Sequence, residues 1–399
     1  MKGDISRRQF LKYTGAGAVG SLAATLTLED VAQAASATPL PVGTPILVIV
    51  TLYGGNDGLN TVAPYLDPVY ASSRPGLSLS GTQVLPISPE LGLNSTMTGF
   101  KALWDAQQLA VILGVSYPQP NYSHFTSMAI WQSASPVEQV SSGWIGRWLD
   151  GLPHDAFRAI GIDSTLTPLL AGDHRAGSML PLSGLQVPYG QLGTDALLMS
   201  NPSPKDTELT GLAASAIADL FQVSATVAPV LKIAPPSSSS RLAQQLDVVG
   251  NLIMANVPTR VYSVSYSGFD THADELGAQS GLIGDVSNAV SGLLTQIAAS
   301  PRANDVVVMV YSEFGRRVNA NGSQGTDHGT SAPVFVAGHR VIGGIYGEQP
   351  SLTALVNGDL AVTTDFRDVY ASMVHDVLGA DPQKILFNWP TKLNLISAS

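Results

Sequence analysis

The chain has 399 residues, of which 45% are hydrophobic and only 13% are charged. This composition supplies a sizeable core and excludes a disordered chain, because disordered chains are rich in charge and poor in apolar residues. The net charge of −10, with no basic cluster, argues against a nucleic-acid partner. The absence of Cys excludes disulfides, thiolate metal sites and cysteine nucleophiles.

Residues 1–34 have the pattern of an export signal. The run at 6–12, Ser-Arg-Arg-Gln-Phe-Leu-Lys, matches the twin-arginine motif, and Ala32-Gln33-Ala34 predicts cleavage before Ala35. A membrane-spanning helix needs about 20 strongly apolar residues. The stretch at 13–28 is shorter and rich in Gly, Ala and Thr, so no stable membrane span is expected. We therefore expect the twin-arginine translocase as an export partner and a periplasmic or extracellular mature protein.

The mature chain alternates apolar runs with helical patterns. Continuous apolar runs, which are typical of strands buried on both faces, occur at 46–52, 109–115, 260–266, 305–311 and 332–337. Helical patterns lie between or after them, at 96–108, 123–132, 281–299 and 366–378. This alternation predicts an α/β fold with a mainly parallel central sheet flanked by helices.

Two further helical patterns, at 206–222 and 241–255, flank a Pro- and Ser-rich segment at 235–240. We interpret the range of about 165–256 as a helical insertion or cap. The prediction is therefore one domain over 35–399 that carries this insertion.

Polar residues gather next to the predicted strands. Segments 54–60, 121–125, 269–272 and 312–316 follow the first four strands, and 326–329 precedes the fifth. In open α/β sheets, sites form outside the carboxyl ends of the strands. Asp270 and His272 are two residues apart, so in an extended chain both side chains point the same way. Carboxylates with imidazoles are ligands for Zn²⁺ or Mn²⁺, and the pattern therefore indicates a metal site.

Each candidate also has a simpler structural interpretation. Asp57, between glycines, would cap the next helix or close a turn, and Ser123 would be the N-cap of the following helix. The second role is compatible with catalysis, because a helix N-terminus also stabilises anions. Glu313 would pair with a neighbouring arginine, and His328 would brace a glycine turn. His375, among apolar residues in a predicted helix, is interpreted as a packing residue.

The motifs as a set resemble a known family. After the twin-arginine signal, G-G-x-D-G-L-N, S-H-F, F-D-T-H, S-E-F-G-R and D-H-G occur in that order. This order resembles bacterial proteins grouped as domain of unknown function 1501, a family similar to the alkaline phosphatase and sulfatase superfamily. Members of that superfamily hold two metals around a Ser or Thr nucleophile. The resemblance implies an alkaline phosphatase-like fold in which Ser123 is the nucleophile, Asp270, His272 and His328 hold one metal, and Asp57, Glu313 and Ser123 hold the other.

The chain also departs from the superfamily pattern. Glu313 is followed by Phe314 at a position where an Asp-His pair is usual, and Phe cannot bind a metal. The second metal would then lack its imidazole, and its site would be weak, empty or filled by a harder ion such as Ca²⁺ or Mg²⁺. Asp327-His328 resembles the missing Asp-His pair. The strand directly after it, however, favours assigning His328 to the position of the superfamily's final histidine.

These observations predict an exported metal-dependent hydrolase of phosphate-type or, second, sulfate-type esters, with a small-molecule or polymer substrate. One or two divalent ions (Zn, Mn, Ca or Mg) would polarise the ester while Ser123 attacks. Arg316 would clamp the anionic group, since its planar fork matches tetrahedral oxyanions. The alternative is a non-catalytic exported or cell-surface protein with a degenerate metal site, which Phe314 favours.

Overall fold

The computed structural model describes residues 39–137, 140–185, 190–200, 207–231 and 240–397. The predicted export signal at 1–34 lies outside the described residues. Within the described part of the chain, no helix combines the length and apolarity needed to cross a bilayer.

A central sheet has the strand order β13-β5-β12-β9-β1-β8-β6-β7, and β14 pairs with β5. All its neighbouring pairs are parallel except those of β12, which runs antiparallel to both β5 and β9. The predicted mainly parallel sheet is confirmed. Its strands are β1 (Ile46–Tyr53), β5 (Leu109–Ser116), β6 (Ala159–Gly161), β7 (Ser178–Met179), β8 (Val261–Ser267), β9 (Val306–Ser312), β12 (Ala332–Ala337), β13 (Gly344–Tyr346) and β14 (Thr364–Asp365).

The reversed direction of β12 matters for the site. Its amino end lies at the same sheet edge as the carboxyl ends of β1, β5, β8 and β9. His328, just ahead of β12, therefore reaches the edge where the residues after β8 and β9 emerge. It ends β11 (Thr326–His328), which pairs antiparallel with β10 (Arg316–Ala320) and sets Arg316 opposite His328.

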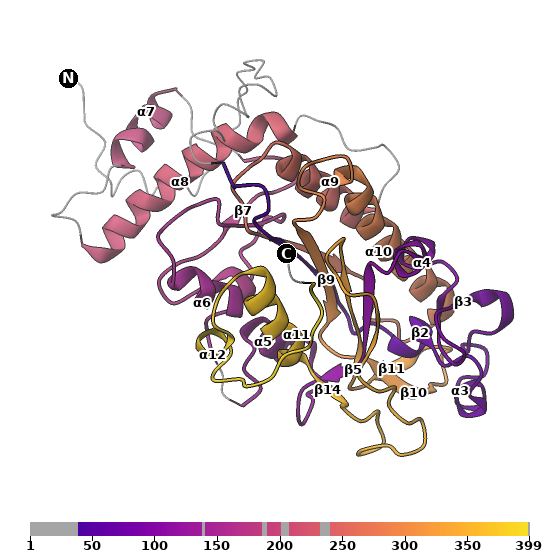
Figure 1. The fold of residues 1–399 in the computed structure, drawn as a ribbon. Coiled ribbons are helices and arrows are strands. Elements are labelled where there is room, and N and C mark those ends of the chain that lie inside the picture. The colour runs from indigo at the N-terminus through magenta and orange to yellow at the C-terminus, as the bar shows by residue number, and fades with distance from the viewer. Residues whose placement is uncertain (1–38, 138–139, 186–189, 201–206, 232–239, 398–399) are drawn as a thin grey trace.

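Helices cover both faces of the sheet (Figure 1). One layer contains α4 (Thr98–Asp105), α9 (Arg241–Met254) and α10 (Glu275–Ile297), and the other contains α5 (His124–Ser133), α6 (Trp144–Asp150) and α11 (Phe366–Ser372). The predicted flanking helices are thus confirmed.

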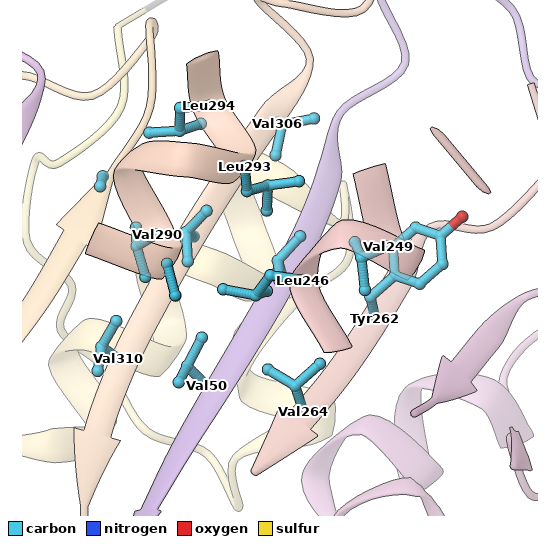
Figure 2. Close-up of a cluster of buried hydrophobic side chains, with 14 of the residues drawn as sticks. Val50, Leu246, Val249, Tyr262, Val264, Val290, Leu293, Leu294, Val306 and Val310 are labelled. Atoms are coloured by element: carbon cyan, nitrogen blue, oxygen red, sulfur yellow. The ribbon is translucent and has the colours of Figure 1, made fainter. Parts of the chain in front are cut away.

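Buried apolar side chains join the helices to the sheet. Figure 2 shows Val50, Val264 and Val310 of three adjacent strands facing Leu246 of α9 and Val290 of α10. Full burial of such a side chain contributes about 1.5–3 kcal/mol. On the opposite face, aromatic rings of α5, α11 and β9 pack together. This two-sided core explains why the central strands are continuous apolar runs.

Smaller elements surround these layers. A three-stranded sheet and α3 follow β1, and α7 and α8 lie beyond the β7 edge of the central sheet (Figure 1). The remaining elements are η1 (Gly58–Asn60), β2 (Val62–Ala63), α3 (Pro68–Ser73), η2 (Gly81–Gln83), β3 (Val84–Pro86), β4 (Gly92–Asn94), η3 (Pro168–Leu170), α7 (Gly190–Met199), α8 (Glu208–Leu231), the π-helix η4 (Met373–Val377) and α12 (Pro382–Ile385).

Two predicted details differ from the structure. The range of about 165–256 contains α7 and α8, but also β7 of the central sheet and α9, which packs on α10 and β8. Its last part therefore belongs to the layer over the sheet. The packing role of His375 was wrong: its side chain is 58% exposed and contacts Asp376, because the π-helical turn presents it to solvent.

Candidate metal centre at the sheet edge

Three imidazoles converge on one carboxylate oxygen. Asp270 Oδ1, in the loop after β8, lies 3.0 Å from His272 Nε2, 3.2 Å from His328 Nε2 and 3.4 Å from His124 Nε2. The Nε2 atoms of His272 and His328 are themselves 2.9 Å apart. We call His124, Asp270, His272 and His328 the histidine cluster.

The opposite nitrogen of each ring faces a group that can only accept a hydrogen bond. These Nδ1 contacts are His124 to Glu313 Oε1 at 2.8 Å, His328 to the Tyr122 carbonyl at 2.8 Å and His272 to Asp327 Oδ1 at 3.4 Å. Such acceptors place the ring proton on Nδ1, so a neutral ring turns an unprotonated Nε2 toward the cluster. His124 Nε2 is buried and has no hydrogen-bond partner among the described residues.

This donor set fits a divalent metal ion. Three Nε2 lone pairs and a carboxylate oxygen repel one another unless a cation lies between them. Zinc–nitrogen bonds of about 2.0–2.1 Å in a tetrahedral site place ligand atoms about 3.3 Å apart, close to the separations in the cluster. His124, Asp270 and His328 each offer a ligand atom, and these atoms all lie within 4.8 Å of one another. The described residues therefore include a possible His/Asp/His metal site.

The charge of Asp270 is fixed by its neighbours. Burial raises the pKa of this carboxyl, but the hydrogen bond and the charge of Arg316 outweigh burial, and the pKa is lowered to about 2. Asp270 is thus ionised at every working pH, as a metal ligand requires. A close backbone approach holds its loop against β1: Gly54 has φ +119°, and a Cβ there would lie 2.4 Å from the Asp270 nitrogen.

Arg316 orients Asp270 from inside the protein. Its Nη2 donates to Asp270 Oδ1 at 2.8 Å, and its side chain is 0% exposed. Nε donates to the Gly55 carbonyl at 2.7 Å and Nη1 to the Thr326 carbonyl at 2.9 Å. Every nitrogen of the guanidinium is therefore engaged by the protein. The predicted anion clamp at Arg316 does not fit this geometry.

Glu313 supports an imidazole instead of facing the cluster directly. It is fully buried, and its Oε1 accepts from the Gly54 amide as well as from His124, both at 2.8 Å. Oε2 accepts from Ser312 Oγ at 2.8 Å. Both oxygens are thus occupied, and the predicted ligand role does not fit. Phe314 packs against the rings of His124 and His328, with centroids 4.9 Å away in each case, and forms an apolar floor.

Asp57 lies in a separate buried network. Its carboxylate pairs with Arg74 Nη1 at 2.5 Å, both side chains are 0% exposed, and it also caps η1 through the Leu59 amide. Burial and the Asp57 charge raise the pKa of the adjacent Glu275 to about 9, so Glu275 is protonated at neutral pH. We call Asp57, Arg74 and Glu275 the Asp57 network. With these partners Asp57 is a structural acid, and its predicted ligand role does not fit.

Ser123 lies at the rim of the cluster. It is the N-cap of α5, and its exposed Oγ accepts from the Thr126 amide at 3.5 Å. The simpler N-cap interpretation is therefore correct. The next residue, His124, was not among the predicted ligands. Its signal was present in the S-H-F motif, where a histidine opens a helix directly after a strand and beside the candidate nucleophile.

The fold and this geometry define an α/β protein with a possible His/Asp metal centre at the carboxyl edge of its sheet. The family model of the "Protein of unknown function (DUF1501)" matches residues 108–392, and the chain belongs to this family. The predicted family is confirmed. No curated protein matches the chain.

Solved structures are similar only at low identity. A protein in the alkaline phosphatase superfamily from Vibrio parahaemolyticus matches at 9% identity, covering 90% of this chain and 76% of that chain, with a TM-score of 0.42. The lipoteichoic acid synthase LtaP from Listeria monocytogenes matches at 9%, covering 91% and 81%, with a TM-score of 0.39. A sulfatase from Pseudoalteromonas sp. matches at 11%, covering 92% and 74%, also at 0.39. These similarities assign no activity.

Proposed function

We propose that the protein is an exported, metal-dependent hydrolase of phosphate-type esters, with sulfate-type esters as the second choice. The observation that carries this proposal is the convergence of three imidazole Nε2 atoms on Asp270 Oδ1, beside an exposed serine at a helix start. In this proposal His124, Asp270 and His328 hold one divalent ion, and His272 is the fourth ligand.

Each group then has a distinct role. A bound divalent ion supplies Lewis-acid polarisation of an ester oxygen. Ser123 supplies the attacking oxygen, and the free amides at the start of α5 favour a negative charge beside it. Glu313 keeps the ring proton on His124 Nδ1, and Arg316 fixes the orientation of Asp270.

We propose one ion where the family resemblance implied two. The second set contained Asp57, Glu313 and Ser123. Asp57 is bound to Arg74, and Glu313 has both oxygens occupied. Only Ser123 of that set is free to face an ion.

The Asp57–Arg74 ion pair favours a second candidate, a non-catalytic exported protein that retains the metal site. The Asp57–Arg74 ion pair removes a carboxylate from the two-metal arrangement on which turnover in the resembled superfamily depends. Turnover separates the two candidates, because both predict a bound metal and only the first predicts ester cleavage.

The test combines metal analysis by mass spectrometry with a panel of phosphate and sulfate esters. His328→Ala should lose the metal and any hydrolysis, whereas Ser123→Ala should keep the metal and lose turnover. His375→Ala is the matched control, since this exposed histidine lies outside the cluster. A His328→Ala variant that binds as much metal as the parent would show that the ligand assignment is wrong. Metal binding without turnover on the whole panel would favour the non-catalytic candidate.

Export is tested separately. The double variant Arg7→Lys, Arg8→Lys should accumulate in the cytoplasm, because the translocase reads the paired arginines directly. Cell fractionation with an antibody to the mature chain measures this. Unchanged export of the double variant would contradict the twin-arginine assignment.

A further inference from the structure

Two consecutive arginines of β10 differ in solvent exposure. Arg316 is buried, whereas the side chain of Arg317 is 51% exposed, because successive side chains of a strand point to opposite faces. Arg317 Nε donates to the His328 carbonyl at 3.4 Å. Arg317 therefore lies at the rim of the histidine cluster, with its charge toward solvent.

The stem of Arg317 is held in place by two neighbours. Its Cζ lies 6.0 Å from the centroid of the Tyr122 ring, and Tyr122 directly precedes Ser123. Its Nε is 3.9 Å from Oδ2 of Asp359, a carboxylate that is only 1% exposed. That oxygen has no hydrogen-bond partner in the described part of the chain. A buried acid and an aromatic face thus fix the guanidinium beside the candidate nucleophile.

The outer end of Arg317 is open. Among the described residues neither of its terminal nitrogens has a protein partner, whereas every nitrogen of Arg316 has one. The terminal N–H groups of an arginine form a planar fork that matches two oxygens of a phosphate or sulfate group. The chain carries a net charge of −10, and acidic Asp270 and Asp327 lie in or beside the cluster. An anionic ester needs a local cation to approach this rim.

We infer that Arg317 binds the anionic group of the substrate and determines its class: an ester with a tetrahedral oxyanion that presents two free oxygens away from the histidine cluster. This inference rests on the proposed function. Arg317 is a specificity-determining residue in it and holds no metal. Its loss should weaken anion binding and leave the metal content unchanged.

The experiment titrates inorganic phosphate into the full mature protein by calorimetry, in metal-loaded and metal-free form. Arg317→Gln should raise the phosphate Kd about 10- to 100-fold, since hydrogen bonds to charged groups are worth about 1.5–3 kcal/mol. Arg317→Lys, which keeps the charge without the fork, should show an intermediate loss. Arg340→Gln is the matched control, because this half-buried arginine follows β12 and lies at the opposite sheet edge.

The outcomes separate the inference from the proposed function. A metal-loaded parent whose phosphate affinity is unchanged by Arg317→Gln would overturn the inference, as would a metal-loaded parent that binds no phosphate. A parent that binds no metal, yet binds phosphate in an Arg317-dependent way, would overturn the hydrolase proposal and leave the anion site standing. A parent that binds neither metal nor phosphate would overturn both the inference and the hydrolase proposal.

Discussion

The histidine cluster and the Asp57 network both pair a buried arginine with an aspartate, yet only the first offers a possible metal site. Asp270 is half exposed, and its Oδ1 faces three imidazoles in addition to Arg316. Asp57 is fully buried, and Arg74 and a backbone amide bind its two oxygens. Asp270, and not Asp57, is therefore the candidate ligand, because the fold leaves it accessible and turns three imidazole Nε2 atoms toward it.

The pKa shifts of the acids also differ between the two regions. Arg316 outweighs the effect of burial and lowers the pKa of Asp270 to about 2. In the Asp57 network, burial and a neighbouring anion raise the pKa of Glu275 to about 9. Changes of pH and substitutions should therefore affect the two regions differently.

The largest expected effect comes from breaking the buried ion pair. Arg74→Met leaves Asp57 buried and uncompensated, which should lower the free energy of unfolding by about 3–5 kcal/mol. The double variant Asp57→Asn, Arg74→Met should recover most of that loss, because no unpaired charge remains. Urea denaturation measures both. If the single variant is as stable as the parent, the network is not the structural element described above.

The support of His124 is the next element to test. Glu313→Gln removes the carboxylate that fixes the His124 proton on Nδ1, and loss of such a partner typically costs 10–100-fold in metal affinity. Competition with a chelating dye gives the metal Kd. The variant Glu348→Gln provides a control, since Glu348 lies outside both regions. Full retention of affinity in Glu313→Gln would contradict the orienting role.

Glu275 should make stability fall as pH rises. A group whose pKa is raised on folding contributes its full stability below its unfolded pKa of about 4.5, and loses it as pH rises toward the folded value of about 9. The slope cannot exceed about 1.4 kcal/mol per pH unit, so between pH 6 and 8 we expect a loss of ~1–2 kcal/mol in the parent. Glu275→Gln should lack this loss. Parallel pH–stability curves of the two proteins would refute the raised pKa of Glu275.

The sequence predicted the strands well because their burial on both faces makes them continuous apolar runs. The family resemblance also implied that Asp270, His272 and His328 belong together, and the structure brings them together. Whether His328 reaches the same edge depended on the antiparallel direction of β12, which no local pattern encodes.

Other features could not be predicted because they depend on strand register or on distant contacts. The choice between Arg316 and Arg317 depends on register, and a shift of one residue exchanges the buried and exposed faces. The partner of Asp57 is 17 residues along the chain, beyond α3, and only the folded chain brings Arg74 to it.

The central claim, that one ion binds in the histidine cluster, is tested most directly by anomalous diffraction at the zinc edge from crystals of the zinc-loaded protein. Our account predicts a single strong peak about 2.0–2.2 Å from His124 Nε2, His328 Nε2 and an Asp270 oxygen. Asp57 should stay bound to Arg74 in the same crystals. A peak bound by Asp57 or Glu313, or zinc-loaded crystals with no peak at the cluster, would contradict it.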